Sequence, residues 1–176
     1  HIIIVSKVSG EIVQGDKTGD EPLSETVKKY LKMKYNKPGN VFLGVVHRLD
    51  RPVSGLVTFA KTSKALSRLN DMFRNGDVHK TYWALTRNYP PAEEGTLTHW
   101  LRRNEQQNKS YAYDKEVPGS KKAMLKYRVI GHGDNYTLLE VNLLTGRHHH
   151  VRRQLAKMGC PINGALKYGA QRSTAH

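Results

Sequence analysis

The hydrophobic and polar positions along the chain alternate in a way that predicts short strands and three helices. Continuous apolar runs and strict apolar–polar alternation are typical of buried and half-buried strands. We expect strands at Ile2–Val5, Val41–Val46, Leu56–Ala60, Thr81–Leu85, Thr96–Leu101, Leu125–Val129 and Leu139–Leu143. Gly131–Asp134 lies between the last two runs, which predicts a hairpin with one solvated face.

Apolar residues at helical spacing predict the three helices. Their apolar stripes lie within Leu23–Leu31, Ala65–Phe73 and Val151–Met158. Thr62 or Ser63 can cap the second helix. Because strands outnumber helices and short links recur, we predict the α+β class. The expected architecture is one domain over residues 1–176, built on a mixed, largely antiparallel sheet flanked by helices.

The charge of the chain is its most unusual overall property. Hydrophobic residues make up 38% and charged residues 25%, which is ordinary for a folded domain. Lys and Arg number 29 against 15 Asp and Glu, so the formal net charge is +14. Such an excess repels itself, and a polyanionic partner, nucleic acid or an anionic membrane surface, explains it best. No apolar run approaches the ~20 residues of a membrane span, so we expect no membrane insertion.

The cysteine count bears on the redox compartment of the protein, and the two ends of the sequence bear on whether residues are missing. Cys160 is the single cysteine, so neither an intramolecular disulfide nor a cysteine-based zinc site can form. A reducing compartment fits, and we expect a cytoplasmic monomer. The chain begins without Met and stops at His176, so we expect residues to be missing at one or both ends.

The first candidate site is the charged stretch His47–Gly55 between two apolar runs. His47, Arg48, Asp50 and Arg51 place four ionisable side chains within five positions. A loop held between strands is a good place for a reactive group. The alternative is a salt-bridged turn in which an arginine neutralises Asp50.

The second candidate site is the basic cluster Arg147–Arg153, which begins after a turn and runs into the third helix. Cations and free N–H groups at a helix start favour an anion site. Its three consecutive histidines do not predict a metal site, because adjacent residues on a helix point about 100° apart. We therefore expect no metal.

Two further features suit RNA. Alternation places Tyr82 and Ala84 on one strand face, where Tyr82 is either a core residue or a ring for base stacking. The polar, basic stretch Arg102–Lys122 contains Tyr111 and Tyr113. Its arginines Arg102 and Arg103 are candidates for an extended phosphate-contacting surface.

These motifs together resemble one enzyme family. His47–Gly55 resembles the His-Arg-Leu-Asp-x-x-[Thr/Ser]-Ser-Gly signature of the RluA family of pseudouridine synthases. Lys80–Ala84 resembles the Lys-x-Tyr-x-Ala that follows in that family. Thr145–Arg152 resembles its Thr-Gly-Arg-x-His-Gln-[Ile/Leu]-Arg segment, and Gly159–Gly169 its Gly-x-Pro-Ile-x-Gly-Asp-x-x-Tyr-Gly stretch. Order and spacing agree over nearly the whole chain.

The resemblance implies the pseudouridine synthase fold and an isomerase that converts uridine to pseudouridine within RNA, without metal or cofactor. Asp50 matches the catalytic aspartate, acting either as nucleophile at C1′ or as base at C2′. Arg152 matches the arginine that pairs with it, and Tyr82 the tyrosine that stacks on the target base. Arg48 matches a residue that enters the RNA stack as the base leaves, which such chemistry requires.

Further RNA contacts are expected from both basic clusters, namely from Arg51, Arg147 and His149. His150 stands where the family has Gln, and Ala165 where Asp is common. No RNA-binding module of the S4 kind is expected before the domain, so RNA selection would fall to this domain. The RNA is ribosomal or transfer RNA, and the sequence does not distinguish them. The alternatives are an RNA chaperone of the same fold without turnover and a basic metal-dependent nuclease.

Overall fold

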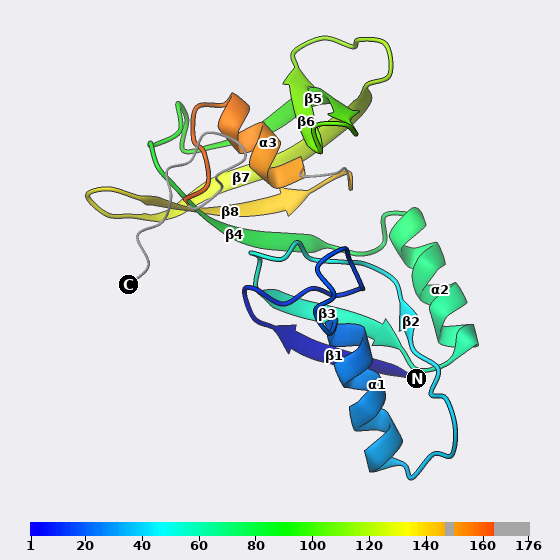
Figure 1. Ribbon diagram of the computed structural model, residues 1–176. Helices are drawn as coiled ribbons and strands as arrows, with labels where there is room; N and C mark the ends of the chain where they lie inside the picture. The colour runs from blue at the N-terminus through cyan, green and yellow to red at the C-terminus, as the bar shows by residue number, and fades with distance from the viewer. Residues whose placement is uncertain (147–149, 164–176) are drawn as a thin grey trace. The chain divides into compact units, whose positions relative to one another are not determined.

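The computed structural model describes residues 1–146 and 150–163 of the chain. Two compact units follow one another along it, His1–Val78 and a second that begins at His79. We call them unit 1 and unit 2. Each is built on its own antiparallel sheet, of three strands in unit 1 and five in unit 2 (Figure 1).

Unit 1 combines a small sheet with two helices. Its strands run in the order β1-β3-β2, and both pairs are antiparallel. The elements are β1 (Ile2–Lys7), α1 (Leu23–Lys34), β2 (Gly44–Val45), β3 (Gly55–Ala60) and α2 (Ser63–Arg74). Thr62 caps α2 by accepting a hydrogen bond from the Ala65 N–H at 3.1 Å, as the sequence predicts.

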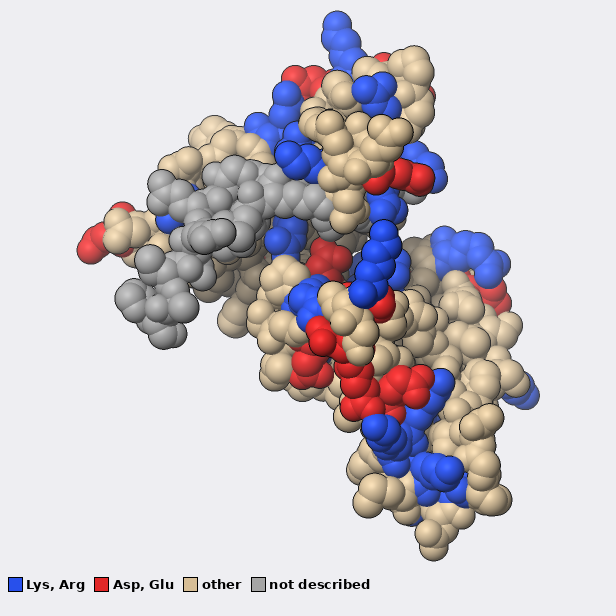
Figure 2. Space-filling model, viewed as in Figure 1, with Lys and Arg blue, Asp and Glu red and all other residues tan. Residues whose placement is uncertain are grey.

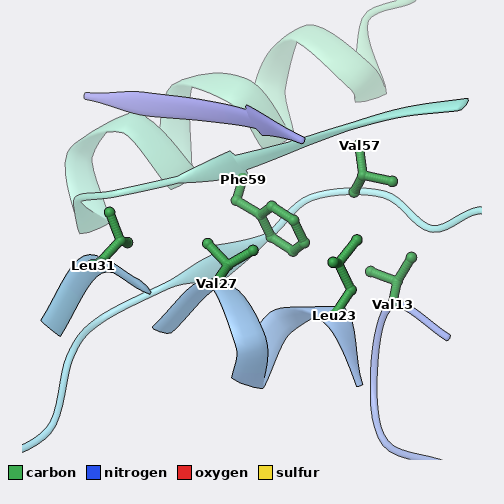
Figure 3. Close-up of a cluster of buried hydrophobic side chains, with 6 residues drawn as sticks. All are labelled: Val13, Leu23, Val27, Leu31, Val57 and Phe59. Atoms are coloured by element: carbon green, nitrogen blue, oxygen red, sulfur yellow. The ribbon is translucent and has the colours of Figure 1, made fainter. Parts of the chain in front are cut away.

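The core of unit 1 lies between α1 and the central strand β3. Leu23, Val27 and Leu31 recur at four-residue spacing, so they share one face of α1. Figure 3 shows these side chains directed toward Phe59 of β3. Val57, on the same strand as Phe59, belongs to the same cluster. Val57 and Phe59 are fully buried. Burying each such side chain contributes roughly 1.5–3 kcal/mol, which fixes β3 and therefore the loop that leads into it.

The expected strand Val41–Val46 is shorter than its apolar run. Only Gly44 and Val45 pair with β3, while Val41 and Leu43 pack against the core without strand pairing. A Cβ at Gly44 would lie 2.8 Å from Cδ1 of Leu66, so the glycine lets α2 approach the backbone closely. The apolar run therefore indicated burial and not the length of a strand.

Unit 2 is a five-stranded sheet with α3 (His150–Lys157) packed on it. The strand order is β4-β8-β7-β5-β6. The strands are β4 (Lys80–Thr86), β5 (Glu94–Asn104), β6 (Lys109–Tyr113), β7 (Lys121–His132) and β8 (Thr137–Leu143). Leu155 of α3 is fully buried against Leu125, Leu139 and Val141.

Strand β6 is an element that the sequence did not predict. The stretch Arg102–Lys122 is so polar that hydrophobic periodicity left it without structure. In the structure β5 runs on to Asn104, and β6 pairs back along it from Trp100↔Tyr113 to Asn104↔Lys109. Asn108 adopts a φ of 48° in the connecting turn, a left-handed conformation that asparagine tolerates well. The resulting β5–β6 hairpin carries Arg102 and Arg103.

The α+β class and the last hairpin are confirmed, but in place of one mixed sheet the structure has two antiparallel sheets, one in each unit. The hairpin of β7 and β8 forms as expected, and every named strand pair is antiparallel, in agreement with the α+β class. In β4, Ala84 is buried and Tyr82 half-buried, whereas Trp83 on the opposite face is 72% exposed. Among the described residues, no helix has the length and apolar character to cross a membrane.

Candidate active site

The charged loop of unit 1, residues 47–54, connects β2 to β3 and carries Asp50. Its first residue is fixed by two contacts. Nε2 of His47 accepts a hydrogen bond from the Thr58 N–H at 2.9 Å, and its ring stacks on Phe73 of α2 with centroids 5.2 Å apart. Gly55 ends the loop with a φ of 149°, a backbone conformation that L side chains rarely adopt. The loop is therefore anchored at both ends.

Lys7 holds the middle of this loop from the neighbouring strand. Its side chain is 1% exposed, and its Nζ donates to the carbonyl oxygens of Val8, Asp50, Arg51 and Val53 at 2.5–3.2 Å. Hydrogen bonds from a charged donor are worth about 1.5–3 kcal/mol each. Three of the four acceptors lie in the loop, so one buried ammonium fixes the backbone around Asp50.

The electrostatics of Lys7 reflect this position. Burial lowers the pKa of Lys7, and the carboxylates of Glu11 and Asp50 act in the opposite direction. The sequence alone did not identify Lys7 as a site residue. The one signal in the sequence was a lysine at the end of an apolar strand, where its side chain can be buried. A buried cation needs several hydrogen-bond partners, so such a lysine indicates a polar contact within the fold. The partners themselves lie 43–46 residues away along the chain.

Asp50 and Arg48 are both exposed side chains of this loop. The backbone at Asp50 makes a second hydrogen bond besides that with Lys7, because its carbonyl oxygen also accepts from the Val53 N–H at 2.9 Å. A further brace comes from the turn after β1, where Ser9 Oγ donates to the Pro52 carbonyl at 3.0 Å. The carboxylate of Asp50 thus projects from a backbone that several independent contacts hold in place.

Arg51 forms ion pairs within unit 1. Its guanidinium lies 3.1 Å from Asp16 Oδ2 and 3.1 Å from Asp20 Oδ2, and it also donates to the Gly10 carbonyl at 3.0 Å. These carboxylates raise the pKa of Arg51, with the hydrogen bond to Asp16 the largest cause. The sequence left open a turn in which an arginine neutralises Asp50, whereas the carboxylates that pair with Arg51 are Asp16 and Asp20.

Tyr82 and Arg152 belong to unit 2. Tyr82 lies on β4 opposite Val141 of β8 and packs against the core of the unit. Tyr82 is half-buried. Part of its ring therefore packs as a core residue, and the rest stays accessible for base stacking. Arg152 is half-buried on α3. Arg147 and His149 of the second basic cluster lie outside the described residues.

Helix α3 is attached to the sheet by a buried polar contact. Nε2 of Gln154 donates to the Ala123 carbonyl at 3.1 Å and lies 2.9 Å from Nδ1 of His99. His99 is 8% exposed, and burial lowers its pKa, partly offset by Asp114 and reinforced by Lys157. The neutral ring can accept at Nδ1, which suits the Gln154 donor. This contact fixes the helix that carries Arg152.

Arg102 and Arg103 are exposed at the end of β5. Nη2 of Arg102 donates to the Tyr113 hydroxyl at 3.1 Å, and Nη2 of Arg103 to Asn108 Oδ1 at 3.3 Å. Both partners are neutral, in contrast to the carboxylates around Arg51. Figure 2 shows basic side chains, with some acidic ones among them, on the part of unit 2 that carries β5 and β6.

The predicted catalytic residues are divided between the two units. Asp50 lies in unit 1, whereas Tyr82 and Arg152 lie in unit 2. Within unit 1 the structure brings Arg48, Asp50 and Arg51 onto one braced loop. The pairing of Asp50 with Arg152 stays a prediction.

Two further groups of side chains bear on other chemistries: clusters that could hold a metal, and the single thiol. No cluster of three or more His, Cys, Asp or Glu side chains suited to a metal occurs in residues 1–146 and 150–163. Burial raises the pKa of the Cys160 thiol, which disfavours its reactive thiolate form.

Comparison with known proteins identifies relatives over most of the chain. A model of the RNA pseudouridylate synthase family matches residues 1–157. An uncharacterised RNA pseudouridine synthase of Chloroflexus aurantiacus is 38% identical over 138 residues, which cover 78% of this chain and 42% of the relative. Ribosomal large subunit pseudouridine synthase C of Vibrio cholerae is 30% identical over 176 residues, covering 100% of this chain and 53% of the relative.

A solved structure has the same fold. The human protein named RNA pseudouridylate synthase domain containing 4 superposes with a TM-score of 0.82 at 22% identity, over 99% of this chain and 70% of the human one. The chain spans about half the length of the curated relatives described above. Together with the ordered motifs from His47 to Gly169, these matches show that the chain belongs to the RNA pseudouridylate synthase family, of the RluA type that its motifs resemble.

Proposed function

We propose that this protein is an RNA pseudouridine synthase, an isomerase that converts specific uridines to pseudouridine in structured RNA. The observation that carries the proposal is the loop 47–54, in which the family's aspartate, Asp50, stands on a backbone held by the buried Lys7 ammonium. A net charge of +14 suits a polyanionic substrate.

The proposed reaction breaks the C1′–N1 glycosidic bond, turns the uracil and joins C5 to C1′. The hydrogen on C5 leaves as a proton and N1 gains one, so substrate and product are isomers. Asp50 supplies the carboxylate, either by attacking C1′ or by accepting a proton at C2′. In both routes the carboxylate must be ionised and correctly aimed. The contacts of Lys7 with the loop fix the backbone that orients this carboxylate.

Arg152 and Tyr82 have complementary roles in this proposal. An arginine beside a carboxylate favours its ionised form and orients it through paired hydrogen bonds. Tyr82 offers a half-buried ring on which the flipped base can stack. Its hydroxyl is a candidate for assisting proton removal at C5. The proposal therefore needs groups from both units in one catalytic domain.

The RNA contacts proposed here follow the geometry of each arginine. Arg48, Arg102 and Arg103 are exposed and suited to phosphate or base contacts. Arg51 already pairs with Asp16 and Asp20, so we propose that it mainly holds the loop and adds less to RNA affinity. Arg147 and His149 stay in the proposed RNA-binding set on the basis of the sequence motif alone.

The name of the Vibrio cholerae relative favours ribosomal RNA as the substrate, with transfer RNA as the second candidate. A monomeric state and a cytoplasmic location are further parts of the proposal. The location is supported by the single cysteine, Cys160, which rules out an intramolecular disulfide and fits a reducing compartment.

The experiment that tests the function uses the purified chain and total cellular RNA that lacks pseudouridine at the candidate sites. Pseudouridine is then mapped by chemical labelling and primer extension. We expect a small set of modified uridines, formed equally with and without a chelator. Tight RNA binding with no pseudouridine would favour the chaperone alternative, and RNA cleavage that a chelator abolishes would favour the nuclease.

A further inference from the structure

The β5–β6 hairpin holds a surface pocket that the proposed reaction does not use. The pocket has a volume of about 500 Å³, within the range of ~300–1,000 Å³ that is usual for small-ligand sites. We call it the hairpin pocket. Its lining includes Arg102, Arg103, Asn104, Gln107, Tyr111 and Tyr113.

The flat side chains of Arg102, Tyr111 and Tyr113 line this pocket, and that of Arg153 lies beside it against Tyr111. The guanidinium of Arg102 lies 5.4 Å from the centre of the Tyr113 ring, and that of Arg153 on α3 lies 5.4 Å from the centre of the Tyr111 ring. Aromatic rings and guanidinium planes are the surfaces on which proteins stack unpaired bases. Both tyrosines are half-buried, so their rings are held in place and still accessible.

Side-chain amides supply hydrogen-bonding groups beside these rings. Asn104 Oδ1 accepts from the Gln107 N–H at 3.2 Å, and the Tyr111 hydroxyl donates to Gln107 Oε1. These contacts orient the two amides, each of which also carries an NH₂ group. An oriented carboxamide can donate to and accept from the edge of an exposed base.

The charge around the pocket suits a phosphate. The segment 102–122 contains six Lys and Arg and three Asp and Glu, a net charge of +3. Arg102 and Arg103 contact the neutral groups of Tyr113 and Asn108, so these contacts leave their charges uncompensated. Glu105 also lines the pocket and opposes an anion there, which places the phosphate at the arginines.

We propose that the hairpin pocket binds one unpaired nucleotide of the RNA, away from the uridine that is isomerised. The base stacks on the tyrosine and arginine planes, the amides of Asn104 and Gln107 contact its edge, and Arg103 holds a phosphate. The choice of RNA as the ligand rests on the proposed function. The pocket adds a way to select RNA by a single-stranded nucleotide at a second point.

Binding is tested with a ligand that the enzyme cannot isomerise. The probe is a fluorescently labelled octamer of adenylate, which contains no uridine, and its affinity is measured by anisotropy. Loss of one stacked base costs roughly 1–3 kcal/mol, so Tyr111→Ala and Tyr113→Ala should each weaken binding roughly 5- to 150-fold. Tyr113→Phe keeps the ring and should stay within about threefold of the wild type, whereas Tyr111→Phe also releases Gln107 and should lose affinity, but less than Tyr111→Ala.

The matched control is Tyr30→Ala, because Tyr30 is also an exposed ring with a cation nearby, Lys34, but lies in unit 1. It should leave the affinity unchanged. An unchanged affinity in both Tyr111→Ala and Tyr113→Ala would overturn the proposal. If free adenosine monophosphate competed as well on a molar basis as the octamer, RNA would not be the ligand, which would also overturn it.

A measurement on the wild type covers the case in which the alanine variants do not fold. An octamer carrying 8-azidoadenosine is photocrosslinked to the protein, and the modified peptides are identified by mass spectrometry. We expect a crosslink within residues 102–113, and crosslinks confined to other segments would refute the pocket. Pseudouridine formation by the wild type is scored separately. If octamer binding depends on Tyr111 while no pseudouridine forms, the pocket proposal is supported and the proposed function is not. If pseudouridine forms while octamer binding does not depend on Tyr111, the pocket proposal is refuted and the proposed function is not.

Discussion

Arg51 in unit 1 and the arginine pair Arg102 and Arg103 in unit 2 differ in what surrounds their charges. Two carboxylates, Asp16 and Asp20, lie 3.1 Å from Arg51. Arg102 and Arg103 donate instead to a tyrosine hydroxyl and an asparagine amide. Both sets were expected to bind RNA from the sequence alone. The difference teaches that a cation is available to an outside anion only if its own fold has not already neutralised it.

The same contrast extends to the units as a whole. Residues 1–78 contain 13 Lys and Arg against 8 Asp and Glu, a net +5, whereas residues 79–176 contain 16 against 7, a net +9. In unit 1 the buried charge of Lys7 and the ion pairs of Arg51 shape a loop. In unit 2 the larger excess includes the exposed arginines of the β5–β6 hairpin. In unit 1 the buried and paired charges hold the loop of Asp50, and only its exposed Arg48 is a proposed RNA contact, whereas in unit 2 the proposed RNA contacts are the exposed arginines of the hairpin.

The largest effect is expected from removing the buried cation of unit 1. Lys7→Met keeps much of the length of the side chain but removes the Lys7 donor from the carbonyl oxygens of Asp50, Arg51 and Val53. The first two still accept from the Val53 and Gly10 N–H groups, so the loss falls mainly on the Val53 carbonyl. An unsatisfied buried acceptor costs roughly 1–3 kcal/mol, and 1.36 kcal/mol corresponds to tenfold in rate, so we expect pseudouridine formation to fall roughly 5- to 150-fold. Hydrogen exchange should show loosened amides in β3 while β7 stays protected.

The control for this variant is Lys64→Met, because Lys64 is an exposed residue of α2. It should change neither activity nor exchange. Lys7→Met with normal activity would mean that the loop keeps its shape without the buried ammonium, and the division of roles between the units would fail.

A smaller effect is expected from acidification, and it should be confined to unit 2. Burial lowers the pKa of His99 below its ordinary value of 6.5. The unfolded chain then binds more protons than the folded one between the two pKa values. The free energy of unfolding is therefore highest above pH 6.5 and declines as pH falls toward the lowered pKa.

Replacing His99 by glutamine removes the titrating group while keeping the hydrogen bond that attaches α3 to the sheet. His99→Gln offers the side-chain carbonyl oxygen as an acceptor for Gln154 but does not titrate. Urea unfolding followed by tryptophan fluorescence reports unit 2, because Trp83 and Trp100 both lie there. The acid-dependent loss of stability should flatten in the variant. An identical pH dependence in both proteins would assign the loss to other groups.

The smallest effect compares the two kinds of arginine directly. Removing one phosphate interaction with single-stranded RNA reduces the log–log salt slope of binding by about 0.7. Replacing Arg102 and Arg103 together by Gln should flatten the slope by roughly twice that amount. Arg51→Gln should change the slope by less than the amount for a single phosphate. Lys64→Gln with Arg68→Gln, two exposed changes on α2, is the matched double control and should leave the slope unchanged.

If Arg51→Gln flattened the salt slope more than the hairpin double variant, Arg51 would be the main phosphate contact. That result would contradict the difference described between the two kinds of arginine. Turnover at saturating RNA should remain close to normal in the hairpin variant, because the substitution removes uniform binding and not stabilisation of the transition state.

The sequence predicted those features of the fold and site that depend on local pattern. The motif His47–Gly55 identified the loop, and alternation placed Tyr82 and Ala84 on the same face of β4. Thr62 was a candidate cap before the structure placed it at the start of α2. Each of these depends on residues within a few positions of one another.

Features that depend on distant residues could not be predicted. Lys7 contacts carbonyl groups 43–46 residues away, and Arg51 pairs with Asp16 and Asp20 at separations of 35 and 31. Strand β6 escaped detection because its pairing with β5 comes from backbone hydrogen bonds and not from an apolar pattern. Val41–Val46 misled for the opposite reason, since Val41, Leu43 and Val45 are half-buried against the core of unit 1 with little strand pairing, and Phe42 is exposed.

The most direct test of the account is the turnover of Asp50→Asn. The amide has nearly the shape of the carboxylate but can neither attack C1′ nor accept a proton at C2′. With a mapped RNA substrate under single-turnover conditions, we expect no detectable pseudouridine, while RNA affinity stays within about tenfold of the wild type, because the expected phosphate contacts come from other residues. Pseudouridine formation near the wild-type rate in Asp50→Asn would contradict the assignment of Asp50 and with it the proposed mechanism.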